Sequence, residues 1–141
     1  IQMISAVSTI ANDGVLVQPQ LVDKITNTDT GEVTEFKTKE IRQVISKSTT
    51  DKVKSMMESV VSEGSGYRVA EQAKGFSIGA KTGTAELKKS KDEEGEVIGW
   101  FNAFTADETS AKQLVVVSMV EDANSVGGSH YLFPKVTQIF K

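Results

Sequence analysis

The sequence predicts an α+β fold in which helices pack against a three-stranded antiparallel sheet. Residues 2–12 and 48–61 carry apolar side chains three and four positions apart, which is the spacing of a helix with one face in the core. Residues 76–87, 98–106 and 113–122 are extended in character and follow one another with short polar connections. Three such segments in succession are typical of an antiparallel meander.

The composition limits the kinds of function that the chain can have. Its 141 residues, of which 38% are hydrophobic, are enough for one domain with a hydrophobic core. The formal net charge is −3 without a basic block, so we expect no nucleic-acid partner. The chain has no cysteine and one histidine, which excludes disulfides and thiolate metal sites, and we expect neither a metal nor another cofactor. No apolar run approaches the ~20 residues that span a bilayer.

The first third of the chain predicts a helix followed by a hairpin. The helix over 2–12 should end near Gly14, which suits a left-handed C-terminal cap. Residues 15–27 are extended, and the turn 28–31 leads into a second extended run, 32–36. We therefore expect a β-hairpin on the surface.

A second helix is predicted to begin at Ser48, because Ser48-Thr49-Thr50-Asp51 fits a capping box. Gly64 and Gly66 should end this helix. We interpret both methionines of its apolar stripe as core residues. The stripe comprises Val53, Met56, Met57, Val60 and Val61.

The second half of the chain is expected to form the sheet and a closing helix. The run 115–120 is apolar at nearly every position, which predicts a central strand covered on both faces. The charged segment 88–97 should be a solvated connection between two strands. In the closing helix, Pro134 is tolerated only near the first turn. The apolar face of that helix is expected to comprise Leu132, Phe133, Val136, Ile139 and Phe140.

The stretch 78–87 raises the functional question, because Lys81 lies there between small residues and threonines. One interpretation is a phosphate-binding P-loop, since residues 75–82 differ by one residue from G-x-x-x-x-G-K-[ST]. A P-loop needs glycine before its lysine, where this chain has Ala80, and it opens directly into a helix. Residues 82–86 are extended in character instead, so nucleotide binding is a poor fit.

The second interpretation takes Lys81-Thr82-Gly83-Thr84 as a ligand-binding strand. A glycine inside a strand makes sense where another backbone or a ligand must approach closely. We expect Lys81, Thr82 and Thr84 to give one face of the strand a cation and hydroxyl groups. Such a face suits a carboxylate-bearing ligand that lies beside the strand.

With this motif in view, the sequence resembles the C-terminal part of a penicillin-binding protein transpeptidase domain of the high-molecular-weight type. "IGAKTGTAE" is similar to the motif strand of this family, and "GWFNAFTA" is similar to the strand that follows it. "IQMISAVSTIANDGVLVQPQLV", "VKSMMESVVSEGSG" and "HYLFPKVTQIF" resemble family helices and occur in the family's order. The resemblance covers all 141 residues and implies a single partial domain, residues 1–141, of a longer protein.

The resemblance implies a role for each residue of the motif. Thr84 takes the position whose backbone N–H forms half of an oxyanion hole, and Lys81 takes the position that biases proton transfer. The hydroxyls of Thr82 and Thr84 would hold the carboxylate of a peptidoglycan stem peptide or of a β-lactam, beside which Gly83 permits close approach. Trp100 either lines this groove or packs beneath it, and the sequence leaves both open.

Two of the family's three catalytic motifs are absent from the sequence. No serine is followed three residues later by lysine, and no Ser-x-Asn occurs. We therefore expect the chain to hold the binding strand without the nucleophile, which leaves its own activity undecided, while the parent would be a serine D,D-transpeptidase. The alternative is part of a non-catalytic β-lactam-recognising sensor or of an inactivated transpeptidase homologue.

The remainder of such a parent also bears on location and association. The family implies an extracytoplasmic protein anchored in the cell membrane by a segment outside this chain. Its N-terminal strands would pair beyond the last strand here, so an exposed sheet edge is expected to permit self-association. The chain departs from the family at Ala80 and at Asn102-Ala103, where Val-Gly is common, and neither departure predicts a function.

Overall fold

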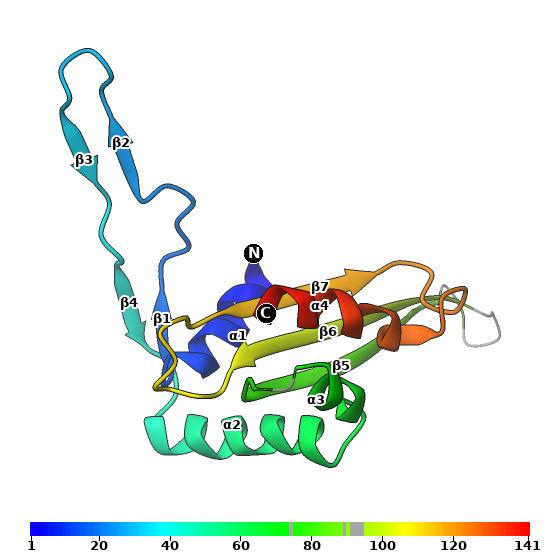
Figure 1. The fold of residues 1–141 in the computed structure, drawn as a ribbon. Helices are drawn as coiled ribbons and strands as arrows, with labels where there is room; N and C mark the ends of the chain where they lie inside the picture. The colour runs from blue at the N-terminus through cyan, green and yellow to red at the C-terminus, as the bar shows by residue number, and fades with distance from the viewer. Residues whose placement is uncertain (74, 89, 91–94) are drawn as a thin grey trace.

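The fold was obtained as a computed structural model that describes residues 1–73, 75–88, 90 and 95–141 (Figure 1). Its centre is a three-stranded antiparallel sheet in the order β5-β6-β7. The strands are β5 (Ile78–Leu87), β6 (Glu96–Thr105) and β7 (Val115–Val120). The predicted α+β class and meander are confirmed, whereas residues 89 and 91–94 of the expected solvated connection lie outside the described part.

The strands lie in the order of the predicted meander, so β6 is the middle strand and the run 115–120, which was expected to be central, forms the last strand of this sheet. Both faces of β7 do contact apolar clusters: Val116 and Val120 pack on one side, and Val115 and Val117 on the other. An apolar run reports how the faces of a strand are covered. It does not report how many neighbours the strand pairs with, and among the described residues β7 pairs with β6 alone.

The first third of the chain forms the predicted helix and hairpin. Helix α1 (Gln2–Ala11) ends at a turn in which Asp13 and Gly14 have φ of 50° and 88°. Strand β2 (Lys24–Thr26) pairs with β3 (Val33–Glu35), as expected from the turn at 28–31.

A second, shorter ladder extends this hairpin toward the body of the molecule. Strand β1 (Val15–Val17) pairs with β4 (Glu40–Gln43), a strand that the sequence reading missed. In Figure 1 the two ladders form an arm that projects away from the central sheet.

Helix α2 (Lys47–Ser62) has its N-cap two residues earlier than predicted, at Ser46 instead of Ser48. Ser46, in an extended conformation, is its N-cap and accepts a hydrogen bond from the Thr49 N–H at 3.3 Å. Met57 and Val61 are buried, as expected, but Met56 is 67% exposed, so its assignment to the core was wrong. A further helix, α3 (Tyr67–Gln72), was not predicted from the sequence.

The closing segment consists of a 3-10 helix, η1 (Gly128–Leu132), and helix α4 (Phe133–Phe140), with Pro134 in the first turn as predicted. Of its expected apolar face, Ile139 is 55% exposed and the other four side chains are buried. Helix α4 is only eight residues long and packs on one cluster, so its apolar stripe is wider than the contact.

Two hydrophobic clusters lie on opposite faces of the sheet. The larger joins β5 and β6 to α3 and α4, with the rings of Phe101 and Phe133 4.5 Å apart. The smaller places Phe104 against Val7 of α1 and Met57 of α2. None of the helices within the described residues has the length and hydropathy to cross a membrane.

Gly79 should be required for the smaller cluster. A Cβ atom at this position would overlap the ring of Phe104, which is buried in the core. We expect Gly79→Ala to lower the free energy of unfolding by about 1–3 kcal/mol, as overpacking does in other cores. Chemical denaturation of the purified chain would measure the change.

The matched control is Gly83→Ala, on the same face of the same strand. A Cβ there would lie 3.3 Å from the Trp100 Cβ, which a small shift can relieve. A loss of stability as large for Gly83→Ala as for Gly79→Ala would contradict this account of the packing.

Candidate functional site

The Lys81-Thr82-Gly83-Thr84 motif lies in the middle of an edge strand. Strand β5 pairs with β6 on one side, and among the described residues no strand pairs with its other side. Its first three residues are buried, whereas the residues from Lys81 onward are exposed or half-buried. The motif therefore offers an accessible backbone edge that is continuous with the core.

The side chains of the motif alternate between the two faces of the sheet. Lys81 lies opposite Asn102, and Gly83 lies opposite Trp100. Thr82 lies opposite Phe101, a core residue of the other face. Since successive strand residues point to opposite sides, the expectation that Lys81, Thr82 and Thr84 share one face was wrong. What they share is the open edge of β5.

Lys81 is exposed, and its ammonium group lies against the strand itself. The Nζ atom donates a hydrogen bond to the backbone carbonyl of Thr82 at 2.6 Å. This contact holds a positive charge beside the open edge, where an anionic ligand would meet it.

Ser65 is a residue of the site that sequence reasoning missed. Its hydroxyl lies 3.1 Å from the Thr82 hydroxyl and shares a hydrogen bond with it. Ser65 sits in the turn between α2 and α3, where Gly66 donates from its backbone N–H to the Val60 carbonyl at 2.9 Å. In the sequence, Gly64-Ser65-Gly66 predicts only the end of a helix, and it contains no signal for a contact 17 residues away.

Trp100 and Asn102 lie on the Lys81 face. The Trp100 side chain is half-buried, and Gly83 passes close enough that an added Cβ would contact it. The carboxamide oxygen Oδ1 of Asn102 is buried, and no described residue gives it a hydrogen bond. A buried acceptor without a donor costs about 1–3 kcal/mol, so this atom requires an explanation.

The groups at this edge have the chemistry to bind an anion. The edge provides an ammonium group, two neighbouring hydroxyls and unpaired backbone groups, which together suit an extended ligand with a carboxylate. Nucleophilic catalysis needs a hydroxyl or thiol with a base in hydrogen-bonding reach. The sequence has neither the Ser-x-x-Lys nor the Ser-x-Asn element that supplies these groups in the resembling family.

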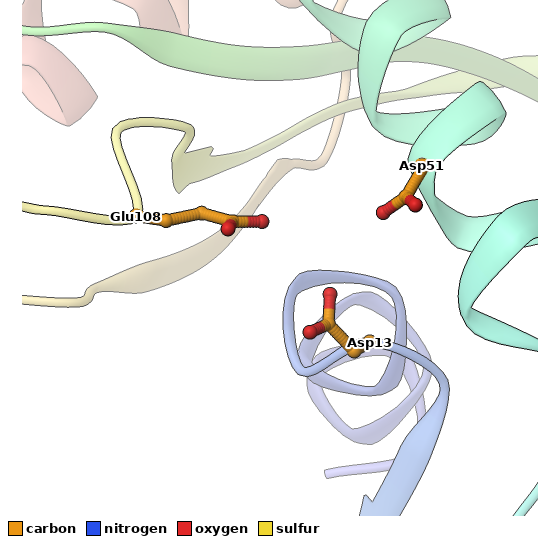
Figure 2. Close-up of side chains that lie close together, drawn as sticks. All are labelled: Asp13, Asp51 and Glu108. Atoms are coloured by element: carbon orange, nitrogen blue, oxygen red, sulfur yellow. The ribbon is translucent and has the colours of Figure 1, made fainter.

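A separate cluster of three carboxylates has the spacing of a metal site. Figure 2 shows Asp13, Asp51 and Glu108, whose oxygens lie within 4.8 Å of one another. The ammonium groups of two lysines form ion pairs with these carboxylates. Lys54 Nζ lies 2.6 Å from Asp13 and 3.1 Å from Glu108, and Lys47 Nζ lies 3.1 Å from Asp13 and 2.9 Å from Asp51. The cluster is therefore a network of ion pairs.

This network joins three parts of the chain: the turn after α1, helix α2 and the connection between β6 and β7. The hydrogen bond from Lys54 lowers the pKa of the Asp13 carboxyl below its ordinary value. Burial alone would lower the pKa of Lys54, but its hydrogen bonds to Asp13 and Glu108 outweigh burial and raise it. Both directions favour the charged pair in the folded protein.

The chain is similar to penicillin-binding proteins along its whole length. The sequence profile described as the penicillin binding protein transpeptidase domain matches residues 1–141. Penicillin-binding protein 3 of Bacillus subtilis is 30% identical over 142 residues, which covers all of this chain and 20% of that protein. This chain therefore spans about a fifth of the length of that relative.

Solved structures share the fold. The crystal structure of a peptidoglycan synthetase from Bifidobacterium adolescentis has a TM-score of 0.77 and 27% identity, over 98% of this chain and 24% of the other. The penicillin G acyl-enzyme complex of penicillin-binding protein A from Mycobacterium tuberculosis has a TM-score of 0.67 and 25% identity, over 85% of this chain and 25% of the other.

Removing one carboxylate from the ion-pair network should destabilise the fold. Asp13→Asn leaves the buried Lys54 with Glu108 as its remaining described carboxylate partner. We expect the free energy of unfolding at pH 7 to fall by about 1–2 kcal/mol. The Lys54 side chain is only 10% exposed, so the loss of a partner is costly. The Asp13 side chain is 41% exposed, so water screens the pair and limits the loss. Urea denaturation measures this. The control Asp51→Asn, in an exposed pair, should have a much smaller effect, and equal losses would contradict the greater weight given to the partly buried Lys54–Asp13 pair.

The stability difference between the wild-type chain and Asp13→Asn should depend on pH in a defined way. The folded-state pKa of Asp13 is lowered from 3.8, so its stabilising contribution is present above that pH and is lost as the pH falls through the lower value. The stability difference between wild type and Asp13→Asn should therefore shrink on acidification below pH 3.8. A difference that is constant from neutral pH to strong acid would refute the assignment.

Proposed function

The chain belongs to the family of penicillin-binding protein transpeptidase domains, and from this membership we propose that residues 1–141 are the C-terminal portion of such a domain and carry its substrate-binding strand. The proposed reaction of the complete domain is D,D-transpeptidation, the cross-linking of peptidoglycan stem peptides through a serine acyl-enzyme. Because peptidoglycan lies outside the cell membrane, the complete protein would act there.

One observation carries the proposal: Lys81-Thr82-Gly83-Thr84 lies on an open strand edge. An extended peptide can add to such an edge through main-chain hydrogen bonds, and side chains of the strand then select the peptide. The buried start of β5, including Ala80, ties this edge to the core, so the binding surface is held in place before the ligand arrives.

Each group of the motif has a proposed role. The backbone N–H of Thr84 forms half of the oxyanion hole, a donor typically worth about 3 kcal/mol to the transition state. The hydroxyls of Thr82 and Thr84 hold the terminal carboxylate of the stem peptide, and Gly83 lets the peptide backbone approach. Lys81 places a positive charge near the groups that transfer protons, and Trp100 supports the strand from the opposite position of β6.

Ser65 extends this carboxylate subsite. If the Ser65 hydroxyl donates to Thr82 across their 3.1 Å contact, the Thr82 proton is free to point at a carboxylate oxygen. A hydroxyl that is already oriented loses less entropy when the ligand binds. The turn between α2 and α3 thus acts on the site through a hydrogen bond.

The same groups would bind β-lactams, whose carboxylate takes the place of the peptide carboxylate. This part of the proposal is supported by the penicillin G acyl-enzyme complex of the M. tuberculosis protein, whose fold the chain shares. The nucleophilic serine and the second motif would come from sequence that precedes residues 1–141 in the complete domain.

Intact mass spectrometry with benzylpenicillin tests whether the nucleophilic serine lies outside residues 1–141. The 141-residue chain should form no covalent adduct with excess benzylpenicillin, because it lacks the serine motif. The longer polypeptide that contains this chain and a Ser-x-x-Lys element should form one adduct per molecule. An adduct on the short chain would show that one of its own serines is nucleophilic. No adduct on the longer protein would instead favour a sensor or an inactivated homologue.

Replacement of Ser65 tests the carboxylate subsite. In the longer polypeptide, Ser65→Ala should lower the second-order rate constant of benzylpenicillin acylation by roughly three- to tenfold, the effect of one neutral hydrogen bond. Stopped-flow fluorescence with a labelled penicillin measures the rate constant. Ser62→Ala, an exposed serine of the same region, is the control and should leave it unchanged. Equal rates for wild type and Ser65→Ala would remove Ser65 from the site.

A further inference from the structure

Resting on the function proposed above, we propose that Asn102 is a positioning residue for Lys81. Its carboxamide oxygen would accept a hydrogen bond from the Lys81 ammonium group and so fix where that charge lies in the substrate site. The inference comes from the juxtaposition of the two side chains on one face of the sheet and from the unused acceptor that Asn102 holds there.

The two residues are directly opposite each other in the β5–β6 ladder. In an antiparallel pair, the Cβ atoms of directly opposed residues are about 4.5–5.5 Å apart, and both side chains lie on the same face of the sheet. A lysine side chain is longer than this separation and has rotatable bonds throughout, so its ammonium group can reach the asparagine without a change in the backbone.

Asn102 has an acceptor to offer. Its Oδ1 is buried and unpartnered among the described residues. Turning the carboxamide over would bury the amide nitrogen in the same position, so one polar atom stays without a partner in either orientation. The neighbours across the strands on this face are Lys81 of β5 and Val117 of β7. Lys81 is the charged donor of this pair, and a lysine cannot accept, which selects the carboxamide oxygen as its partner.

Lys81 has donors to spare. Its ammonium group carries three N–H bonds, and one of them is used in the contact with the Thr82 carbonyl. Its remaining N–H bonds are the donors that the proposal assigns to Asn102. The ammonium group would then be held by two acceptors, the Thr82 carbonyl and the Asn102 carboxamide oxygen, instead of by the carbonyl alone.

A purely structural role explains Asn102 poorly. Asparagine is disfavoured in strands, and here it stands between Phe101 and Ala103, both fully buried. An apolar residue of similar size would avoid the buried acceptor altogether. A residue that breaks local rules inside a binding strand pair is expected where function requires it.

Asn102→Leu separates the two roles. In the 141-residue chain the thermal unfolding midpoint should stay the same or rise, because the unpartnered acceptor is gone. Lysine-selective 15N NMR of the same protein should show the Lys81 ammonium signal, assigned with Lys81→Gln, at a changed position. An unchanged Lys81 signal would overturn the proposal, whatever the outcome of any acylation assay.

Acylation supplies the second arm. In the longer polypeptide, Asn102→Leu should slow acylation by benzylpenicillin about tenfold, as small displacements of site groups do. Asn102→Asp, which retains an acceptor oxygen, should stay within about threefold of wild type. The control Asn124→Leu, at an exposed position, should have no effect. Equal rates for the leucine and aspartate variants would overturn the positioning role. Failure of the wild-type protein to acylate at all would count against the proposed function, and the NMR result would still decide this inference.

Discussion

The alternation of side chains along β6 connects every layer of this molecule. Phe101 and Ala103 enter the cluster formed with α3 and α4, while Phe104 enters the cluster formed with α1 and α2. Each buried phenylalanine is worth roughly 1.5–3 kcal/mol of transfer free energy. The same strand hydrogen-bonds to β5 and β7. A shift of β6 by one residue would exchange the two faces and dissolve both clusters, so the register is strongly determined.

The site inherits its rigidity from this arrangement. Strand β5 is buried up to Ala80 and becomes accessible from Lys81 onward, so one continuous element is anchored at one end and open at the other. Binding surfaces that are built on regular elements keep their geometry better than those built on loops. Gly83 completes the surface because its lack of a side chain leaves room beside Trp100.

Polar contacts then fix the elements that flank the sheet. Lys54 ties helix α2 to the turn after α1 and to the β6–β7 connection, and Ser65 in the turn after α2 contacts Thr82. Helix α2 is thus held by ion pairs at its middle and, through the turn that follows it, by a hydroxyl pair. This gives the proposed carboxylate subsite a support that is independent of β6.

The sequence by itself determined the kinds of element, most of their positions and the family. Apolar spacing identified α1, α2 and α4, the turn at 28–31 identified the β2–β3 hairpin, and the order of the motifs indicated the transpeptidase domain, because all of these are local signals. Tertiary structure alone decided which hydrophobic cluster covers each face of the sheet and that Met56 and Ile139 are exposed. It also decided the contacts of Ser65 and Asn102. Those features depend on which segments meet across the fold, and a one-dimensional pattern of hydrophobicity contains no term for such pairing.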